Sequence, residues 1–145
     1  MDNCRPWRLW RASVVSGLNG CTILVADDER YITTTISLKL RQAGATVITA
    51  SDGREALELA RLHLPDVICT DYRMPLMSGL QFAKRLVASP ATAHIPVVML
   101  TTRGHRMSPT EVAQTNIRAL LGKPFSTREL LAKLQEVVLE AGIAA

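Results

Sequence analysis

The sequence predicts an α/β fold in which one parallel sheet of five strands is covered by helices on both faces. Five short apolar segments alternate strictly with five helical patterns, and this alternation is typical of parallel sheets. The apolar segments are continuous rather than two-periodic, as expected of strands that are buried on both sides. The chain has 145 residues, of which 48% are hydrophobic and 21% charged, enough for one domain of this kind.

Each strand is predicted from a short run of apolar and often β-branched residues. Pro96 is compatible with this reading because proline is tolerated at the first position of a strand. The fifth run, Ala119-Leu120-Leu121, is the shortest. In chain order, the predicted strands are residues 22–26, 46–50, 67–70, 96–101 and 119–121.

Each helix is predicted from apolar spacing and from a start or stop signal. Ile32, Ile36 and Leu40 are spaced by four, as on one buried helix face. Gly44 then stands where a left-handed residue often ends a helix. Three later helices begin at an Asp or Ser followed three positions on by Glu or Gln, as in a capping box, and one begins at Pro109, favoured at the first helical position. The predicted helices are residues 30–43, 52 to about 62, 78 to about 88, 108 to about 115, and 126 onward.

The composition changes near the start of the first strand. Residues 1–20 contain both tryptophans, Trp7 and Trp10, and no sustained helical or strand period. We therefore predict a flexible N-terminal extension, with a short amphipathic anchor that carries both tryptophans on one side as the alternative. The domain itself is predicted to cover residues 21–142, followed by a tail over residues 143–145.

Composition and spacing argue against several classes of protein. No apolar stretch approaches the about 18 residues that cross a membrane, and the N-terminus lacks the about 7 consecutive apolar residues of a signal peptide. We therefore expect a cytoplasmic protein without a membrane span. The net charge of +4 includes no basic run, so no direct binding to nucleic acid is predicted. The three cysteines and three histidines lack zinc-site spacing.

Acidic, hydroxyl and basic side chains stand directly after the predicted strands. Ligands of open parallel sheets bind beyond the carboxyl ends of the strands, so we expect these side chains at one edge. Two carboxylates about 5 Å apart repel each other by roughly 3 kcal/mol at an effective dielectric near 20, and a hard cation such as Mg²⁺ relieves that repulsion. A carboxylate beside Mg²⁺ can attack phosphorus and form an acyl phosphate. The residues at this edge are Asp27, Asp28, Asp71, Thr101 and Lys123.

This set of residues resembles the signature of the receiver domain of two-component response regulators. The resemblance covers residues 21 to about 142, and the motifs occur in the family's order along the chain. It implies a flavodoxin-like, doubly wound sheet with strand order 2-1-3-4-5 and five helices. The matching residues are Asp27-Asp28, Asp71-Tyr72-Arg73-Met74-Pro75, Thr101 and Lys123-Pro124-Phe125.

The resemblance implies a role for each of these residues. Asp71 would accept a phosphoryl group from a phosphohistidine on a sensor histidine kinase or a histidine phosphotransfer protein. Lys123 would pair with Asp71 and then with its phosphoryl group, and Thr101 would bind a phosphoryl oxygen. Pro124 resembles the family's cis-proline. The implied Mg²⁺ ligands are Asp27, Asp28, Asp71 and the backbone carbonyl of Arg73.

Departures from the family pattern concern the output switch and the phosphoryl pocket. Leu120 stands where receivers usually carry Tyr or Phe, three residues before the lysine. The aromatic output switch is therefore in question, whereas phosphorylation is not. Thr102 replaces the small residue that usually follows the switch threonine, and its β-branched side chain would crowd the phosphoryl pocket.

We therefore expect a stand-alone receiver, monomeric or dimeric upon phosphorylation. It would not be an enzyme with an external substrate, although it would catalyse its own phosphorylation and dephosphorylation. Output would pass to a downstream protein through the fourth helix, fifth strand and fifth helix. The main alternative is a pseudo-receiver scaffold that binds its partner independently of phosphorylation. A phosphotransfer enzyme of the haloacid-dehalogenase kind is disfavoured because it needs Asp-x-Asp after the first strand, whereas Asp27 and Asp28 are adjacent.

Overall fold

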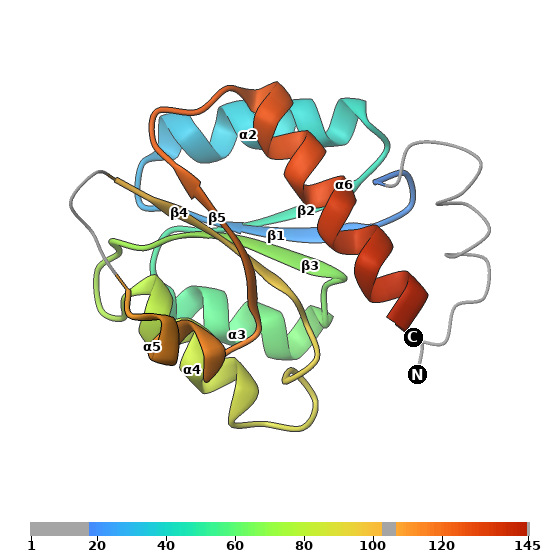
Figure 1. The fold of residues 1–145 in the computed structure, drawn as a ribbon. Helices are drawn as coiled ribbons and strands as arrows, with labels where there is room; N and C mark the ends of the chain where they lie inside the picture. Colours follow the sequence, from blue (N-terminus) through green and yellow to red (C-terminus); the bar gives the residue numbers. More distant parts are fainter. Residues whose placement is uncertain (1–17, 103–106, 145) are drawn as a thin grey trace.

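The computed structural model describes residues 18–102 and 107–144 of the chain (Figure 1). Residues 1–17, most of the predicted extension, lie outside the described residues. The strands are β1 (Thr22–Ala26), β2 (Thr46–Ala50), β3 (Val67–Asp71), β4 (Val97–Thr101) and β5 (Ile117–Gly122). The helices are α2 (Arg30–Gln42), α3 (Gly53–His63), α4 (Gly79–Val87), α5 (Pro109–Ala113) and α6 (Thr127–Ala144).

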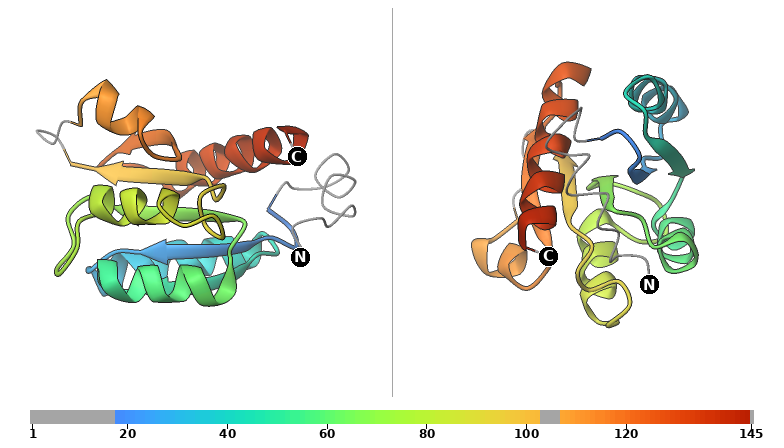
Figure 2. Two further views of the ribbon diagram at one scale, coloured as in Figure 1. Left: turned by 90° about the horizontal axis from the view of Figure 1, so that it is seen from below. Right: turned by 90° about the vertical axis from the view of Figure 1, so that its right-hand side faces the viewer.

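The described strands form one parallel five-stranded sheet with the order β2-β1-β3-β4-β5. Helices α2 and α6 lie over one face of the sheet, and α3, α4 and α5 lie over the other (Figures 1 and 2). This arrangement confirms the predicted fold class. The chain reverses its direction of winding between β1 and β3, which is the place where such sheets bind ligands.

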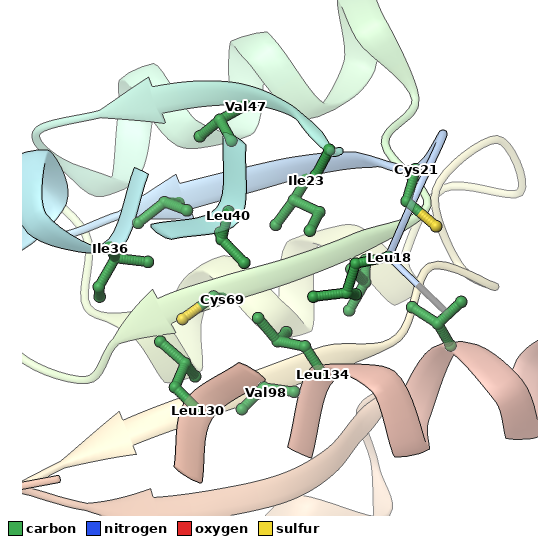
Figure 3. Packing of buried hydrophobic residues seen from close by; sticks show 14 of the residues in the cluster. Leu18, Cys21, Ile23, Ile36, Leu40, Val47, Cys69, Val98, Leu130 and Leu134 are labelled. Atoms are coloured by element: carbon green, nitrogen blue, oxygen red, sulfur yellow. The ribbon is translucent and has the colours of Figure 1, made fainter. Parts of the chain in front are cut away.

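The central strands are buried on both faces because their alternate residues enter two different hydrophobic clusters. Ile23 and Val25 of β1 point into the cluster beneath α2 and α6, whereas Leu24 and Ala26 point into the cluster beneath α3 and α4. Figure 3 shows part of the first cluster. Leu18 belongs to it and is fully buried, so the packed structure includes the end of the segment that we predicted to be a flexible extension.

The local start and stop signals are confirmed in the structure. The Ser78 hydroxyl accepts a hydrogen bond from the Gln81 N–H, and the Gln81 side chain accepts one from the Ser78 N–H. The Asp52 carboxylate accepts from the Glu55 N–H. Gly44, with φ +94°, has the left-handed backbone that favours glycine.

The boundaries of three elements differ from the prediction by about two residues, and those of several others by one. Strand β5 runs over Ile117–Gly122 because it pairs with β4 along its length, and this tertiary pairing extends it beyond its apolar run. Helix α5 ends at Ala113, and α6 continues to Ala144, into the residues that we predicted to be a tail. Among the residues that the structure describes, no helix is both long enough and apolar enough to cross a membrane.

Candidate functional site

Three carboxylates gather at the carboxyl edge of the sheet. Ala26 of β1 lies opposite Thr70 of β3, so the residues that follow them, Asp27 and Asp71, come side by side. Asp28 joins them from the loop after β1. Each of the three side chains offers an oxygen, and these oxygens lie within 4.8 Å of one another. The structure therefore brings together the three acidic residues that the sequence placed at this edge.

An ammonium group reaches this acidic cluster from the far side of β4. Lys123 follows β5, and its backbone N–H donates to the Thr101 carbonyl at 2.7 Å. Its Nζ lies 3.0 Å from Asp71 Oδ1 and 3.2 Å from Asp27 Oδ2. It also lies 4.0 Å from Glu29 Oε1, a residue to which the sequence analysis assigned no role. The peptide bond between Lys123 and the next residue, Pro124, is cis, as the resemblance implied.

The pKa values of Asp27, Asp71 and Lys123 differ from their ordinary values. Asp27 and Asp71 are 1% and 5% exposed, and burial raises the pKa of Asp27 to about 6, although the Glu29 N–H hydrogen bond opposes the change. Burial likewise raises the pKa of Asp71, with Lys123 acting against it. Burial tends to lower the pKa of Lys123, but the hydrogen bond to Asp71 and the charges of both carboxylates raise it overall. Burial is therefore the largest cause of both raised carboxyl pKa values, and the ammonium group of Lys123 opposes it at each carboxylate.

The donor atoms of the cluster suit Mg²⁺. All three side chains offer carboxylate oxygens, which are the ligands that this hard cation prefers. One lysine leaves the three carboxylates with a net deficit of positive charge, and Asp28 is exposed, so part of the site faces water. Mg²⁺ usually keeps several waters in protein sites. Arg73, whose backbone carbonyl we predicted as a fourth ligand, lies two residues after Asp71 in the exposed loop before α4.

Two further predicted positions border the site. Thr101 is the last residue of β4 and is partly exposed. Its neighbour Leu100 pairs with Asp71, so the threonine lies beside the acidic cluster. Leu120, which replaces the usual aromatic residue, is 50% exposed on β5.

Two glycines that contact the ends of the segment from Asp71 to Met77 were not given a role in binding or catalysis. A Cβ atom added to Gly79 would lie 2.3 Å from the Asp71 carbonyl oxygen, and one added to Gly53 would lie 2.2 Å from the Met77 carbonyl oxygen. The first contact closes the loop between β3 and α4, and the second joins two segments that are far apart in the sequence. A glycine at the start of a predicted helix was the available signal, but no local pattern indicates which backbone approaches it.

The comparison with known families decides what this arrangement is. Residues 23–135 match the family described as the response regulator receiver domain. The chain belongs to this family. It is thus a receiver domain of two-component signalling.

Curated relatives of the receiver domain include two transcriptional regulatory proteins. It is 34% identical over 123 residues to the phosphate regulon transcriptional regulatory protein PhoB of Pseudomonas aeruginosa, covering 85% of this chain and 54% of that protein. It is 35% identical over 123 residues to the alkaline phosphatase synthesis transcriptional regulatory protein PhoP of Bacillus subtilis, covering 85% of this chain and 50% of that protein. The chain therefore spans about half the length of the curated relatives that it matches.

Solved structures of similar proteins share the fold along nearly their whole length. The chemotaxis response regulator CheY4 of Vibrio cholerae is 37% identical, with a TM-score of 0.74, and the match covers 81% of this chain and 98% of that one. The receiver domain of the sensor histidine kinase PA1611 from Pseudomonas aeruginosa is 28% identical, with a TM-score of 0.73, over 82% of this chain and 98% of that one. That structure has a magnesium ion coordinated in its active site cleft.

Proposed function

We propose that this receiver domain takes a phosphoryl group onto Asp71 from a phosphohistidine on a sensor histidine kinase or a histidine phosphotransfer protein, in a reaction that requires Mg²⁺. The observation that carries the proposal is the contact between Lys123 Nζ and Asp71 Oδ1, at 3.0 Å, beside the buried carboxylate of Asp27. An acceptor carboxylate, a fixed ammonium group and an oxygen-donor cluster are the components that phosphoryl transfer to a carboxylate needs.

The transfer itself is a substitution at phosphorus. A carboxylate oxygen of Asp71 forms a bond to phosphorus as the phosphorus–nitrogen bond to the donor histidine breaks, and the imidazole nitrogen keeps the electron pair of that bond. The product is an acyl phosphate. In this proposal Lys123 pairs with the phosphoryl oxygens, and the Thr101 hydroxyl donates a hydrogen bond to one of them. The chemistry that Mg²⁺ supplies when bound by Asp27, Asp28, Asp71 and the Arg73 carbonyl is compensation of the phosphoryl charge.

A largely apolar groove beside the site supports a protein as the phosphoryl donor. Tyr31, on α2, is 81% exposed at this groove. Lys123 belongs both to the groove and to the acidic site, so a donor domain seated in the groove would lie next to Asp71. The groove has a volume of about 470 Å³ and is lined by Tyr31, Ile32, Thr35, Ile36, Lys123, Pro124, Phe125 and Thr127.

The output of phosphorylation is proposed to be a change in protein contacts on the face formed by α5, β5 and α6. The exposed Leu120 side chain lies on this face, on a strand that ends at Gly122, one residue before Lys123 in the site. We propose that the domain catalyses its own phosphorylation and dephosphorylation without turning over an external substrate. That it acts as a monomer or a phosphorylation-dependent dimer, and does not itself bind nucleic acid, stays a prediction.

Phosphorylation by a small-molecule donor tests the acceptor directly. With Mg²⁺ and acetyl phosphate, the wild-type protein is expected to gain the mass of one phosphoryl group, whereas Asp71→Asn is expected to gain none. Asp66→Asn is a matched control, because Asp66 accepts from the Thr22 N–H at the opposite edge of the sheet and asparagine keeps an acceptor oxygen. Equal phosphorylation of Asp71→Asn and the wild type would exclude Asp71 as the acceptor.

A second candidate function is a scaffold whose binding does not depend on phosphorylation. The observation that favours it is the exposed leucine at position 120, since an aliphatic side chain lacks the ring and the polar tip of the usual aromatic residue. Partner capture with and without acetyl phosphate separates the two candidates. Capture that is the same for the wild type and for Asp71→Asn under both conditions would favour the scaffold.

A further inference from the structure

The loop between β3 and α4, residues 72–78, is fixed at both ends. At its start, the Tyr72 N–H donates to the Leu100 carbonyl of β4 at 2.9 Å. At its end, the Gly79 N–H donates to the Tyr72 carbonyl at 2.8 Å. This loop carries Arg73, whose carbonyl is the proposed fourth metal ligand. The position of the loop therefore affects where the Arg73 carbonyl lies relative to the other proposed metal ligands.

The middle of the loop rests on the first residue of α3. The carbonyl of Pro75 accepts from the Met77 N–H at 2.7 Å and from the Gly53 N–H at 3.4 Å. Gly53 is buried, and a Cβ atom there would lie 2.2 Å from the Met77 carbonyl oxygen and 2.5 Å from the Met77 Cβ. Carbon atoms do not approach backbone atoms this closely, so a side chain at position 53 must push the two segments apart.

The loop, and not the helix, is the segment that would move. Helix α3 is held by its buried face, which includes Ala56, Leu57 and Ala60, and by the Asp52 cap on the Glu55 N–H. The loop is exposed at Pro75 and Leu76, whereas Met74 and Met77 on either side of them are partly buried against the core cluster. A buried helix face resists displacement because movement would open cavities in the core, whereas exposed loop residues shift at lower cost.

We infer that Gly53 is a positioning residue for the metal site: because it has no side chain, the loop can rest on α3 and hold the segment that carries Arg73 close to Asp71. This inference rests on the proposed function, because it assumes that the acidic cluster binds Mg²⁺. Gly53 itself touches no ligand. It acts through Pro75 and Met77, in the way that residues behind a metal site set the position of its ligands.

Mg²⁺ binding by the variant Gly53→Ala tests the inference without any phosphoryl donor. Isothermal titration with Mg²⁺ alone is expected to show about a tenfold loss of affinity, the lower end of what such supporting residues contribute. With acetyl phosphate, the Mg²⁺ concentration for half-maximal phosphorylation should rise by the same factor, while the rate at saturating Mg²⁺ recovers. Gly122→Ala is the matched control, because a Cβ atom at Gly122 meets nothing within 4 Å, and it should bind Mg²⁺ as the wild type does.

A second variant separates positioning from general damage to the fold. In Gly53→Ala with Met77→Gly, the contact with the Met77 Cβ is gone, but the carbonyl oxygen at position 77 still lies 2.2 Å from the added Cβ. Glycine at position 77 frees the backbone so that this carbonyl can turn away, and Mg²⁺ affinity should then recover at least in part. Wild-type affinity in Gly53→Ala, or no recovery in the double variant, would overturn the inference. Absence of Mg²⁺ binding by the wild-type protein would instead overturn the proposed metal site, and the inference with it.

Discussion

Lys123 extends from the end of β5 past β4 to the carboxylate of Asp71 on β3, where Nζ and Oδ1 are 3.0 Å apart. The same ammonium group lies 3.2 Å from Asp27 Oδ2. One side chain thus bridges two buried carboxylates at the ends of the neighbouring strands β1 and β3. Removing one partner of a buried charge pair leaves the other charges uncompensated, so this lysine matters both to the resting site and to phosphoryl transfer.

Replacing Lys123 by methionine is expected to slow phosphorylation by acetyl phosphate by about 10²–10³-fold, the usual effect of losing one charge-stabilising group. The loss has a physical cause: no ammonium remains to pair with the phosphoryl oxygens, and the pKa of Asp71 rises further without Lys123. The rate is measured by intact mass against time. Lys133→Met is the control, since Lys133 pairs with Glu136 on the surface of α6. A wild-type rate in Lys123→Met would contradict the proposed role.

The stability of the metal-free protein should fall as the pH rises from about 4 to about 6. Burial raises the pKa of Asp27 from 3.8 to about 6 in the folded state, so the folded state binds more protons than the unfolded state over this window. The stabilisation is fully present below the lower value and is lost as the pH passes the higher one; it amounts to about 3 kcal/mol. Asp71, whose pKa is also raised, acts in the same direction.

Urea unfolding at pH 4.5 and pH 7.5 measures this effect. Asp27→Asn should flatten the pH profile and stabilise the metal-free protein at pH 7.5, because an amide carries no charge to bury. Mg²⁺ should raise the stability at pH 7.5, since it binds the ionised carboxylates. A chelator should return the stability to the lower value of the metal-free protein. A wild-type stability that is equal at the two pH values without metal would show that the burial of Asp27 does not have this effect.

The site was largely predictable from sequence because its geometry follows from strand order and strand ends. Asp27 and Asp71 lie at the carboxyl ends of adjacent parallel strands, and Lys123 follows the fifth strand at the same edge of the sheet. Capping pairs such as Ser78 with Gln81 are local and were also predictable. The contact of Gly53 with Met77 and the burial of Leu18 depend on how separate segments pack, and no spacing in the sequence encodes them.

Tyr31 should matter for phosphorylation by a protein donor and not by a small molecule. Its exposed ring borders the groove that shares Lys123 with the acidic site, and exposed aromatic side chains often contribute most of the binding energy of an interface. Tyr31→Ala is therefore expected to lower the phosphotransfer rate from a phosphorylated histidine kinase about tenfold or more at limiting receiver concentration. Leu62→Ala is the control, because Leu62 is an exposed residue of α3 that does not line the groove. Equal slowing with acetyl phosphate would place the effect in the site and not in donor binding.

Gly79→Ala is expected to destabilise the fold and to disturb the acceptor together. A Cβ atom at Gly79 would lie 2.3 Å from the Asp71 carbonyl oxygen and 2.9 Å from Met99 Sδ. The methionine side chain can rotate away, but the backbone of Asp71 cannot move without shifting β3, which pairs with β1 and β4. Overpacking of this kind costs about 1–3 kcal/mol, which exceeds the gain of less than about 1 kcal/mol that alanine offers over glycine in a helix.

The two consequences of Gly79→Ala have different measurements. Urea unfolding should show the lower stability, and the phosphorylation rate, measured well below the unfolding midpoint, should fall because the Asp71 carboxylate moves with its backbone relative to Lys123. A variant that loses stability and keeps the wild-type rate would mean that α4 yields and β3 stays in place. In that case the strand, held on both sides by its neighbours, defines the position of Asp71 independently of the helix that follows it.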